Sequence, residues 1–168
     1  MTQPFPQWQW GSSDSALSRV AGRFAATTAG SWVIRTLTPL DRRVLERTGA
    51  KYTVLGPVGA PVLLLTTTGR KSRLPRTQPL LYVHDGDTLY VVGSNFGQAH
   101  HPAWTGNLLA EPTATVAVAG ERIPITATPI EGAAKEEIFQ RFVELTGAYA
   151  AYRDRTSRDL QVFALTRA

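Results

Sequence analysis

The stretch Thr66–Ser72, which reads TTTGRKS, combines residue types that bind an anion. A turn that contains a glycine presents successive backbone N–H groups, and this one adds two cations and a hydroxyl, so it can contact a phosphate from several sides. Arg76 lies at the start of the next predicted strand, within reach of the same anion. Taken alone, such a turn is more often a solvated basic hairpin, so the anion site needs support from elsewhere in the chain.

A second loop, Gly93–Gly97, supplies that support. Its sequence GSNFG brings small and polar groups to the end of another predicted strand. One basic loop and one glycine-containing loop from the same run of strands are typical of the walls of an anionic cofactor site. Trp104, on the short helix predicted after this loop, can stack on a flat ring or pack in the core, and residue type alone does not separate these hypotheses.

Other site types lack their sequence signatures. The chain contains no G-x-G-x-x-G, G-x-x-x-x-G-K-[ST], H-E-x-x-H or G-x-S-x-G motif. It has no cysteine, which excludes thiol catalysis and thiolate metal sites. His84 falls in a predicted hairpin turn, and His100 and His101 are adjacent, a poor spacing for ligating one metal ion. We therefore expect no metal site.

Charge and hydropathy limit the partners. The net charge of +5 favours an anionic partner: a phosphorylated cofactor, an anionic membrane surface or nucleic acid. Nucleic acid is not expected, because no aromatic strand pattern accompanies the basic residues. Residues 1–14 show no signal peptide, and the longest aliphatic run, Val62–Leu65, is too short to span a bilayer. A cytoplasmic location is expected.

The elements that must position these loops follow from the periodicity of apolar residues. Leu17, Val20, Ala21 and Phe24 predict a helix over 14–26, and Thr38-Pro39-Leu40-Asp41 predicts the start of a second helix that ends at Gly49. Beyond Lys51 the period changes to two, which indicates strands. Strands are predicted over 62–68, 76–83, 88–94, 113–119, 122–128 and 160–165, and further helices over 102–109 and 133–146. Five or six strands connected mostly by hairpins indicate a small antiparallel barrel.

Several motifs in one order resemble the deazaflavin-dependent nitroreductase and quinone reductase family. The resemblance is densest from Pro61 to Pro112. There it rests on Leu65–Ser72, Pro75–Thr77, Pro79–Leu80, Ser94–Asn95, Gly97, His101–Pro102, Trp104 and Asn107–Leu108. Near the end of the chain it rests on Tyr149, Tyr152 and Arg158. It implies a mostly β fold with flanking helices, a split β-barrel of the flavin-reductase type that binds coenzyme F420. This cofactor is a deazaflavin with a phosphodiester and an acidic oligoglutamate tail.

The resemblance also implies roles for individual residues. Tyr152 and Tyr149 match tyrosines near the acceptor, and Tyr152 would orient and polarise it. The implied cofactor-binding residues are Thr68, Gly69, Arg70, Lys71, Ser72, Arg76, Pro79, Leu80, Ser94, Asn95, Trp104 and Asn107. Two positions depart from the family pattern: Asn95 stands where a lysine is frequent, which removes one charge, and Thr146 stands in place of a third tyrosine, which argues against nitroimidazole reduction.

These observations predict a tail over 1–13, a basic helical lead-in over 14–50 and a deazaflavin-binding split barrel over 51–168. The expected function is hydride transfer from reduced F420 to a small conjugated acceptor such as a quinone or nitro compound. Two alternatives stay open: a split barrel that uses flavin mononucleotide, and a non-catalytic cofactor- or lipid-binding protein. Two hypotheses are open for the lead-in. In one it packs on the barrel; in the other it contacts the inner face of the cell membrane peripherally, through Arg19, Arg23, Trp8 and Trp10.

Overall fold

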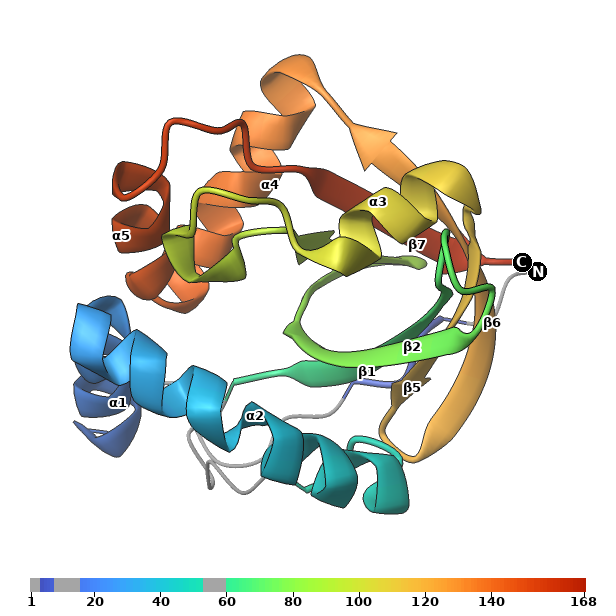
Figure 1. Ribbon diagram of the computed structural model, residues 1–168, viewed down its shortest axis with the longest axis horizontal. Helices are drawn as coiled ribbons and strands as arrows, with labels where there is room; N and C mark the ends of the chain where they lie inside the picture. Colours follow the sequence, from blue (N-terminus) through green and yellow to red (C-terminus); the bar gives the residue numbers. More distant parts are fainter. Residues whose placement is uncertain (1–3, 8–15, 53–59) are drawn as a thin grey trace.

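The computed structural model describes residues 4–7, 16–52 and 60–168. Its centre is a curled sheet of seven antiparallel strands in the order β2-β1-β5-β6-β7-β4-β3 (Figure 1). The strands are β1 Val62–Thr68, β2 Pro75–Leu81, β3 Val83–Asp85, β4 Thr88–Val92, β5 Thr113–Val118, β6 Glu121–Ile130 and β7 Val162–Arg167. The predicted split-barrel type of fold, mostly β with flanking helices, is therefore confirmed.

One extended segment forms both edges of the sheet. The sequence predicts a single strand over 76–83, but the chain divides at Tyr82 into β2, which pairs with β1, and β3, which pairs with β4. Because β2 and β3 are the two outermost strands, this break curls the sheet on itself. His84 consequently lies in β3 rather than in the turn, which corrects its predicted position.

Strand β1 is buried on both faces. Leu63 and Leu65 point into the barrel core, and Leu64 packs on the outside against Leu45 and Ala50 at the end of α2. A continuous aliphatic run is the pattern expected for a strand covered on both sides. Phe5, within the predicted tail, is also buried in the barrel core, and residues 1–3 and 8–13 of that tail lie outside the described residues.

Two helices precede the barrel, α1 Ala16–Ala26 and α2 Thr28–Thr48. The predicted helix start at Thr38 is wrong, because α2 begins ten residues earlier and carries Pro39 inside it. Thr27 caps the helix by accepting a hydrogen bond from the Gly30 N–H at 2.9 Å. A threonine–proline pair is typical of a first turn, but an interior proline removes only one backbone bond, and packing can offset its cost of about 3 kcal/mol. The predicted end at Gly49 is confirmed by its left-handed cap.

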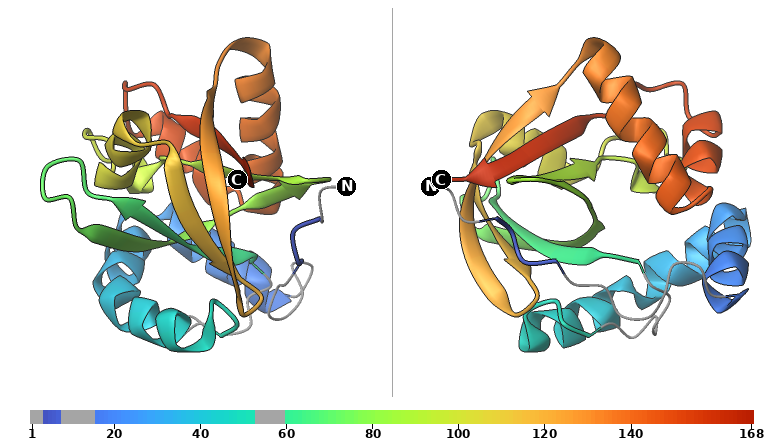
Figure 2. Two further views of the ribbon diagram at one scale, coloured as in Figure 1. Left: turned by 90° about the vertical axis from the view of Figure 1, so that its right-hand side faces the viewer. Right: turned by 180° about the vertical axis from the view of Figure 1, so that it is seen from behind.

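The remaining helices surround the barrel rim. They are α3 Ala103–Ala110, α4 Gly132–Leu145 and α5 Ala148–Asp154, and a 3-10 turn spans Asn95–Gly97. Helices α1, α4 and α5 lie at one end of the molecule, where α1 contacts α5, and α2 runs along the side of β1 and β2 (Figure 2). The sequence predicts α4 but not the separate α5, which carries Tyr149 and Tyr152.

Candidate functional site

Helix α3 fixes the turn between β1 and β2. Buried Asn107 accepts a hydrogen bond from the Arg70 backbone N–H at 3.1 Å and donates one to the Thr67 hydroxyl at 3.0 Å. The Arg70 guanidinium lies so close to Gly106 that a Cβ there would overlap it, at 1.6 Å. Asn107 was predicted to contact the cofactor, and the structure shows that it anchors the turn that carries the predicted cations.

The turn itself presents its cations to solvent. The Gly69 N–H donates to the Leu74 carbonyl at 2.8 Å, which closes the turn, and Ser72 accepts a hydrogen bond from Arg76 at 3.3 Å. Arg70, Lys71 and Arg76 are exposed, and within the described part of the chain none of them forms an ion pair with an acid. Unpaired like charges held close together repel one another, so this turn favours a bound anion.

The second predicted loop packs against the same helix. A Cβ on Gly93 would lie 2.7 Å from the Thr105 side chain of α3, so this loop and the β1–β2 turn contact one helix. Asn95 directs its amide to the Gln98 side chain and the His100 carbonyl, at 3.3 and 3.0 Å, so its donors serve the loop itself. The structure thus brings both loops of the sequence prediction into contact with α3.

Tyr149 and Tyr152 lie in an aromatic cluster on α5. Their rings are 5.8 Å apart, Tyr149 also packs on Phe142 at 5.0 Å, and Tyr152 packs edge-on against Phe96 at 5.7 Å. Burial, and next the neighbouring Tyr152, raise the pKa of the Tyr149 hydroxyl well above its usual value of 10. Tyr149 therefore stays protonated at neutral pH and can act only as a neutral hydrogen-bonding group. Phe96 connects this cluster to the Gly93–Gly97 loop.

Three other residues predicted to contact the cofactor, Trp104, Leu80 and Pro79, lie in the barrel core or on strand β2. Trp104 is 4% exposed and packs on Phe163 in the barrel core at 5.7 Å between ring centroids, so core packing accounts for its position. Leu80 packs on the same core. Pro79 precedes it on β2, and successive strand side chains point to opposite faces, so Pro79 is the one that faces outward.

An Asn107→Leu substitution is expected to lower the free energy of unfolding by about 2–3 kcal/mol, because a buried donor or acceptor left without a partner costs about 1–3 kcal/mol. The same change should weaken cofactor binding, since it frees the Arg70 backbone. Chemical denaturation and a cofactor titration measure both effects. Leu109→Asn, at an exposed position of the same helix, is the control. Wild-type stability in Asn107→Leu would contradict the anchoring role.

Comparison with known proteins identifies the family. Residues 32–167 match the sequence profile of a family described as F420H2-dependent quinone reductase. The chain belongs to this family. It is 36% identical over 116 residues to an F420H2-dependent quinone reductase of Mycobacterium tuberculosis, across 66% of this chain and 76% of that protein.

Solved structures agree with this assignment. An F420-H2 dependent reductase of the FDR-A group is 36% identical with a TM-score of 0.58, over 62% of this chain and 93% of that one. A second structure, described as a domain-swapped dimer, is 32% identical with a TM-score of 0.60, over 80% and 97%. This F420H2-dependent quinone reductase family member is thus an oxidoreductase that uses reduced coenzyme F420, which confirms the predicted enzyme class and cofactor.

The donor set fits this cofactor. F420 carries an acidic tail, and Arg70 and Lys71 of the β1–β2 turn and Arg76 of β2 are exposed cations without an ion-pair partner among the described residues, beside backbone that Asn107 holds in place. Within the described ranges no cluster of three or more histidine, cysteine or acidic residues is placed to hold a metal ion. In the same part of the reductase, no helix is both long and apolar enough to cross a membrane.

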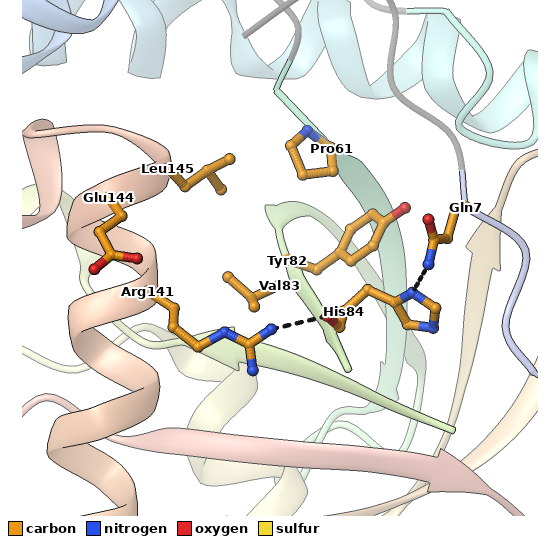
Figure 3. Close-up of a pocket in the computed structure, with 8 residues that line it drawn as sticks. All are labelled: Gln7, Pro61, Tyr82, Val83, His84, Arg141, Glu144 and Leu145. Atoms are coloured by element: carbon orange, nitrogen blue, oxygen red, sulfur yellow. Dashed lines mark hydrogen bonds between the residues drawn. The ribbon is translucent and has the colours of Figure 1, made fainter. Parts of the chain in front are cut away.

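A cleft of about 570 Å³ lies elsewhere, between α4, β3 and the start of β1 (Figure 3). Arg141 crosses its floor to donate to the His84 carbonyl at 3.0 Å and pairs with Asp85 at 2.9 Å, and Gln7 contacts the His84 ring. None of the predicted site residues lines this cleft.

Arg158 is the residue whose structural role the sequence does not reveal. The family resemblance includes Arg158 without giving it a role, and in the structure its guanidinium contacts backbone carbonyls of the Gly93–Gln98 loop, about 60 residues earlier in the chain. It also contacts His101, whose pKa is lowered by burial and by the Arg158 charge. No local pattern could indicate these contacts, because they depend on the fold bringing the two segments together.

Proposed function

We propose that this reductase binds the acidic tail of F420 at the β1–β2 turn and the deazaflavin along the Gly93–Gly97 loop, and reduces a quinone presented near Tyr152. The observation that carries the proposal is the group formed by Arg70 and Lys71, on a turn anchored by Asn107, and Arg76 at the start of β2, which are exposed and form no ion pair with a described acid. Gly69, Ser72 and Thr68 supply the backbone and hydroxyl groups of the same turn. The family's name specifies a quinone acceptor, and the aromatic surroundings of Tyr152 suit a flat conjugated ring.

When bound, reduced F420 supplies the hydride, so the protein contributes binding, orientation and exclusion of water. By binding the tail, the cations of the turn would fix where the ring lies in the site. A ring held in this way meets the acceptor in one orientation, which lowers the entropic cost of bringing cofactor and acceptor together. Tyr152 is the group that we propose donates a hydrogen bond to an acceptor oxygen as negative charge develops there. Tyr149, whose ring packs against that of Tyr152 at 5.8 Å, supports the orientation of Tyr152.

Tyr152→Phe tests this role. The ring remains and only the hydroxyl is lost, so the fold and F420 affinity should change less than twofold, while quinone reduction falls at least tenfold, as expected when a donor used in the transition state is removed. The measurement is the oxidation of F420H2 by a soluble quinone, with a nitroaromatic compound as second acceptor. Tyr90→Phe, on β4, is the matched control. Wild-type turnover in Tyr152→Phe would show that the hydroxyl takes no part.

We further propose that α1 contacts an anionic membrane surface from the cytoplasmic side. The sequence pattern is compatible with packing of this helix on the barrel, but Val20 and Phe24 are 63% and 47% exposed. Arg19 and Arg23 directly precede them in the chain and are exposed as well. An exposed face that mixes cations with large apolar groups is typical of helices that lie in a membrane interface. Quinones dissolve in membranes, so such contact would bring the enzyme to its acceptor.

The membrane proposal predicts co-sedimentation with vesicles that contain anionic lipid and little binding to neutral vesicles. Arg19→Glu with Arg23→Glu should abolish sedimentation and leave reduction of a soluble quinone unchanged. The control, Arg122→Glu with Arg47→Glu, makes the same change in charge at exposed positions away from α1. Equal loss in both double variants would refute a specific role for α1.

A further inference from the structure

The side chain of Arg158, from outside the loop, binds three backbone carbonyls of the loop between β4 and α3. Its Nε donates to the Gln98 carbonyl and its Nη1 to the Gly93 carbonyl, both at 2.9 Å, and its Nη2 donates to the Ser94 carbonyl. Nη1 also lies 3.3 Å from Nδ1 of His101. Hydrogen bonds from a charged donor are stronger than neutral ones, and the planar guanidinium fixes their directions.

The loop that these bonds hold has an unusual backbone. Asn95, Phe96 and Gly97 follow one another with positive φ angles of 45°, 56° and 75°. A left-handed conformation costs about 1–2 kcal/mol for a residue with a Cβ, so Asn95 and Phe96 are both strained. Such residues persist where the surrounding structure holds them, and they concentrate at functional sites. Contacts to carbonyls on both sides of the strained residues make Arg158 the group that holds this conformation.

The same arrangement leaves three backbone N–H groups of the loop available to a ligand. The loop carbonyls of Gly93, Ser94 and Gln98 point to Arg158. Ser94 has a right-handed backbone conformation, and Asn95, which follows it, has a left-handed one. In such a pair the successive N–H groups point into one concavity, which can bind an anion or a carbonyl oxygen. Within the described part of the chain, the N–H groups of Ser94, Asn95 and Phe96 have no hydrogen-bond partner. These donors are available only while the loop keeps its shape.

The loop also sets the position of Tyr152. Gly97 packs so closely against α5 that a Cβ there would lie 2.6 Å from the Tyr152 carbonyl oxygen. The Phe96 ring contacts the Tyr152 ring edge-on at 5.7 Å. A displacement of the loop would therefore move both the Ser94 donors and Tyr152, which connects the cofactor side of the site to the acceptor side.

We infer that Arg158 is a positioning residue of the reductase: it holds the Gly93–Gln98 loop in the conformation that presents the N–H groups of residues 94–96 to the cofactor and Tyr152 to the acceptor. The inference rests on the proposed function of that loop. Arg158 acts through the loop, by way of its backbone carbonyls, and we assign it no contact with the reacting atoms.

The test compares Arg158→Ala and Arg158→Lys with a matched control, Arg141→Ala, which removes a guanidinium that also binds a backbone carbonyl but lies away from the loop. Hydrogen exchange of peptides covering residues 93–98 is measured without cofactor, and F420 affinity is measured by titration. Lysine keeps the charge but cannot span three carbonyls, so it should behave much as alanine does. Guanidinium ion is then added to Arg158→Ala, with equal sodium chloride as the control.

We expect exchange of the hydrogen-bonded loop amides, those of Gly93, Gly97 and Gln98, to rise at least tenfold in both Arg158 variants. F420 affinity should fall at least tenfold in both, and neither change is expected in Arg141→Ala. Guanidinium, but not sodium chloride, should restore part of the affinity of Arg158→Ala. If that variant does not fold, Arg158→Lys carries the test. Unchanged loop exchange overturns the inference, as does faster exchange with unchanged affinity. If the wild type itself binds no F420, the proposed function fails, while the exchange data still decide whether Arg158 holds the loop.

Discussion

Replacing Lys71 and Arg76 together by alanine is expected to weaken F420 binding about a hundredfold. Both side chains are exposed, so each contact with the acidic tail is screened by solvent and contributes near the low end of the range for charged hydrogen bonds, about 1.5 kcal/mol. Two such contacts amount to about 3 kcal/mol, and each 1.4 kcal/mol corresponds to tenfold in affinity. A fluorescence titration of each variant with F420 measures the change.

A tail-less deazaflavin separates this effect from damage to the ring site, because its affinity should be nearly the same in the wild type and the double variant. Arg47→Ala with Arg122→Ala removes the same charge from exposed positions elsewhere, and it should leave F420 affinity within about twofold. The wild-type affinity should also fall as salt rises, more steeply than that of the double variant. Equal losses for both ligands, or for both double variants, would show that the turn is not the tail site.

Gly97→Ala is expected to lower the free energy of unfolding by about 2–5 kcal/mol and to impair quinone reduction. Gly97 has a φ of +75°, which costs about 1–2 kcal/mol for alanine. In addition, the new Cβ would meet the Tyr152 backbone at 2.6 Å, and relieving such overpacking costs typically about 1–3 kcal/mol. Denaturant unfolding and steady-state turnover at a temperature where the variant stays folded measure the two effects.

Gly86→Ala is the matched control, because Gly86 also has a positive φ, +55°, but nothing lies within 4 Å of its Cβ position. It should lose only the conformational part, about 1–2 kcal/mol, and keep wild-type turnover. The difference between the two variants then isolates the contact between the loop and α5. If Gly97→Ala is no less stable than Gly86→Ala and reduces quinone normally, the loop and Tyr152 are not coupled in the way that the contacts indicate.

The sequence predicts the parts of this structure that depend on local patterns. The strand ending in Thr68 and the helix end at Gly49 are where they were expected, because alternation, turn residues and caps act over a few residues. The errors arise where long-range packing decides. Thr38-Pro39 has the local signature of a helix start, yet α2 continues through it, and the strand over 76–83 breaks at Tyr82 because its two halves pair with different partners.

The same distinction applies to the site. The types and spacing of Arg70, Lys71 and Arg76 indicate an anion site without any structure. The anchoring role of Asn107 and the contacts of Arg158 could not be predicted, because each joins segments about 40 or 60 residues apart. The burial of Trp104 was left open at the level of residue type, since an indole suits both a cofactor ring and a barrel core.

The measurement that tests the central claim most directly is a parallel titration of the wild-type protein with oxidised F420 and with flavin mononucleotide, followed by fluorescence quenching. We expect tight, salt-sensitive binding of F420 and weak or no binding of flavin mononucleotide, because the cations of the β1–β2 turn match a long acidic tail. Tight binding of flavin mononucleotide alone would contradict the assignment of the site. Binding of neither would show that the β1–β2 turn is a solvated basic hairpin.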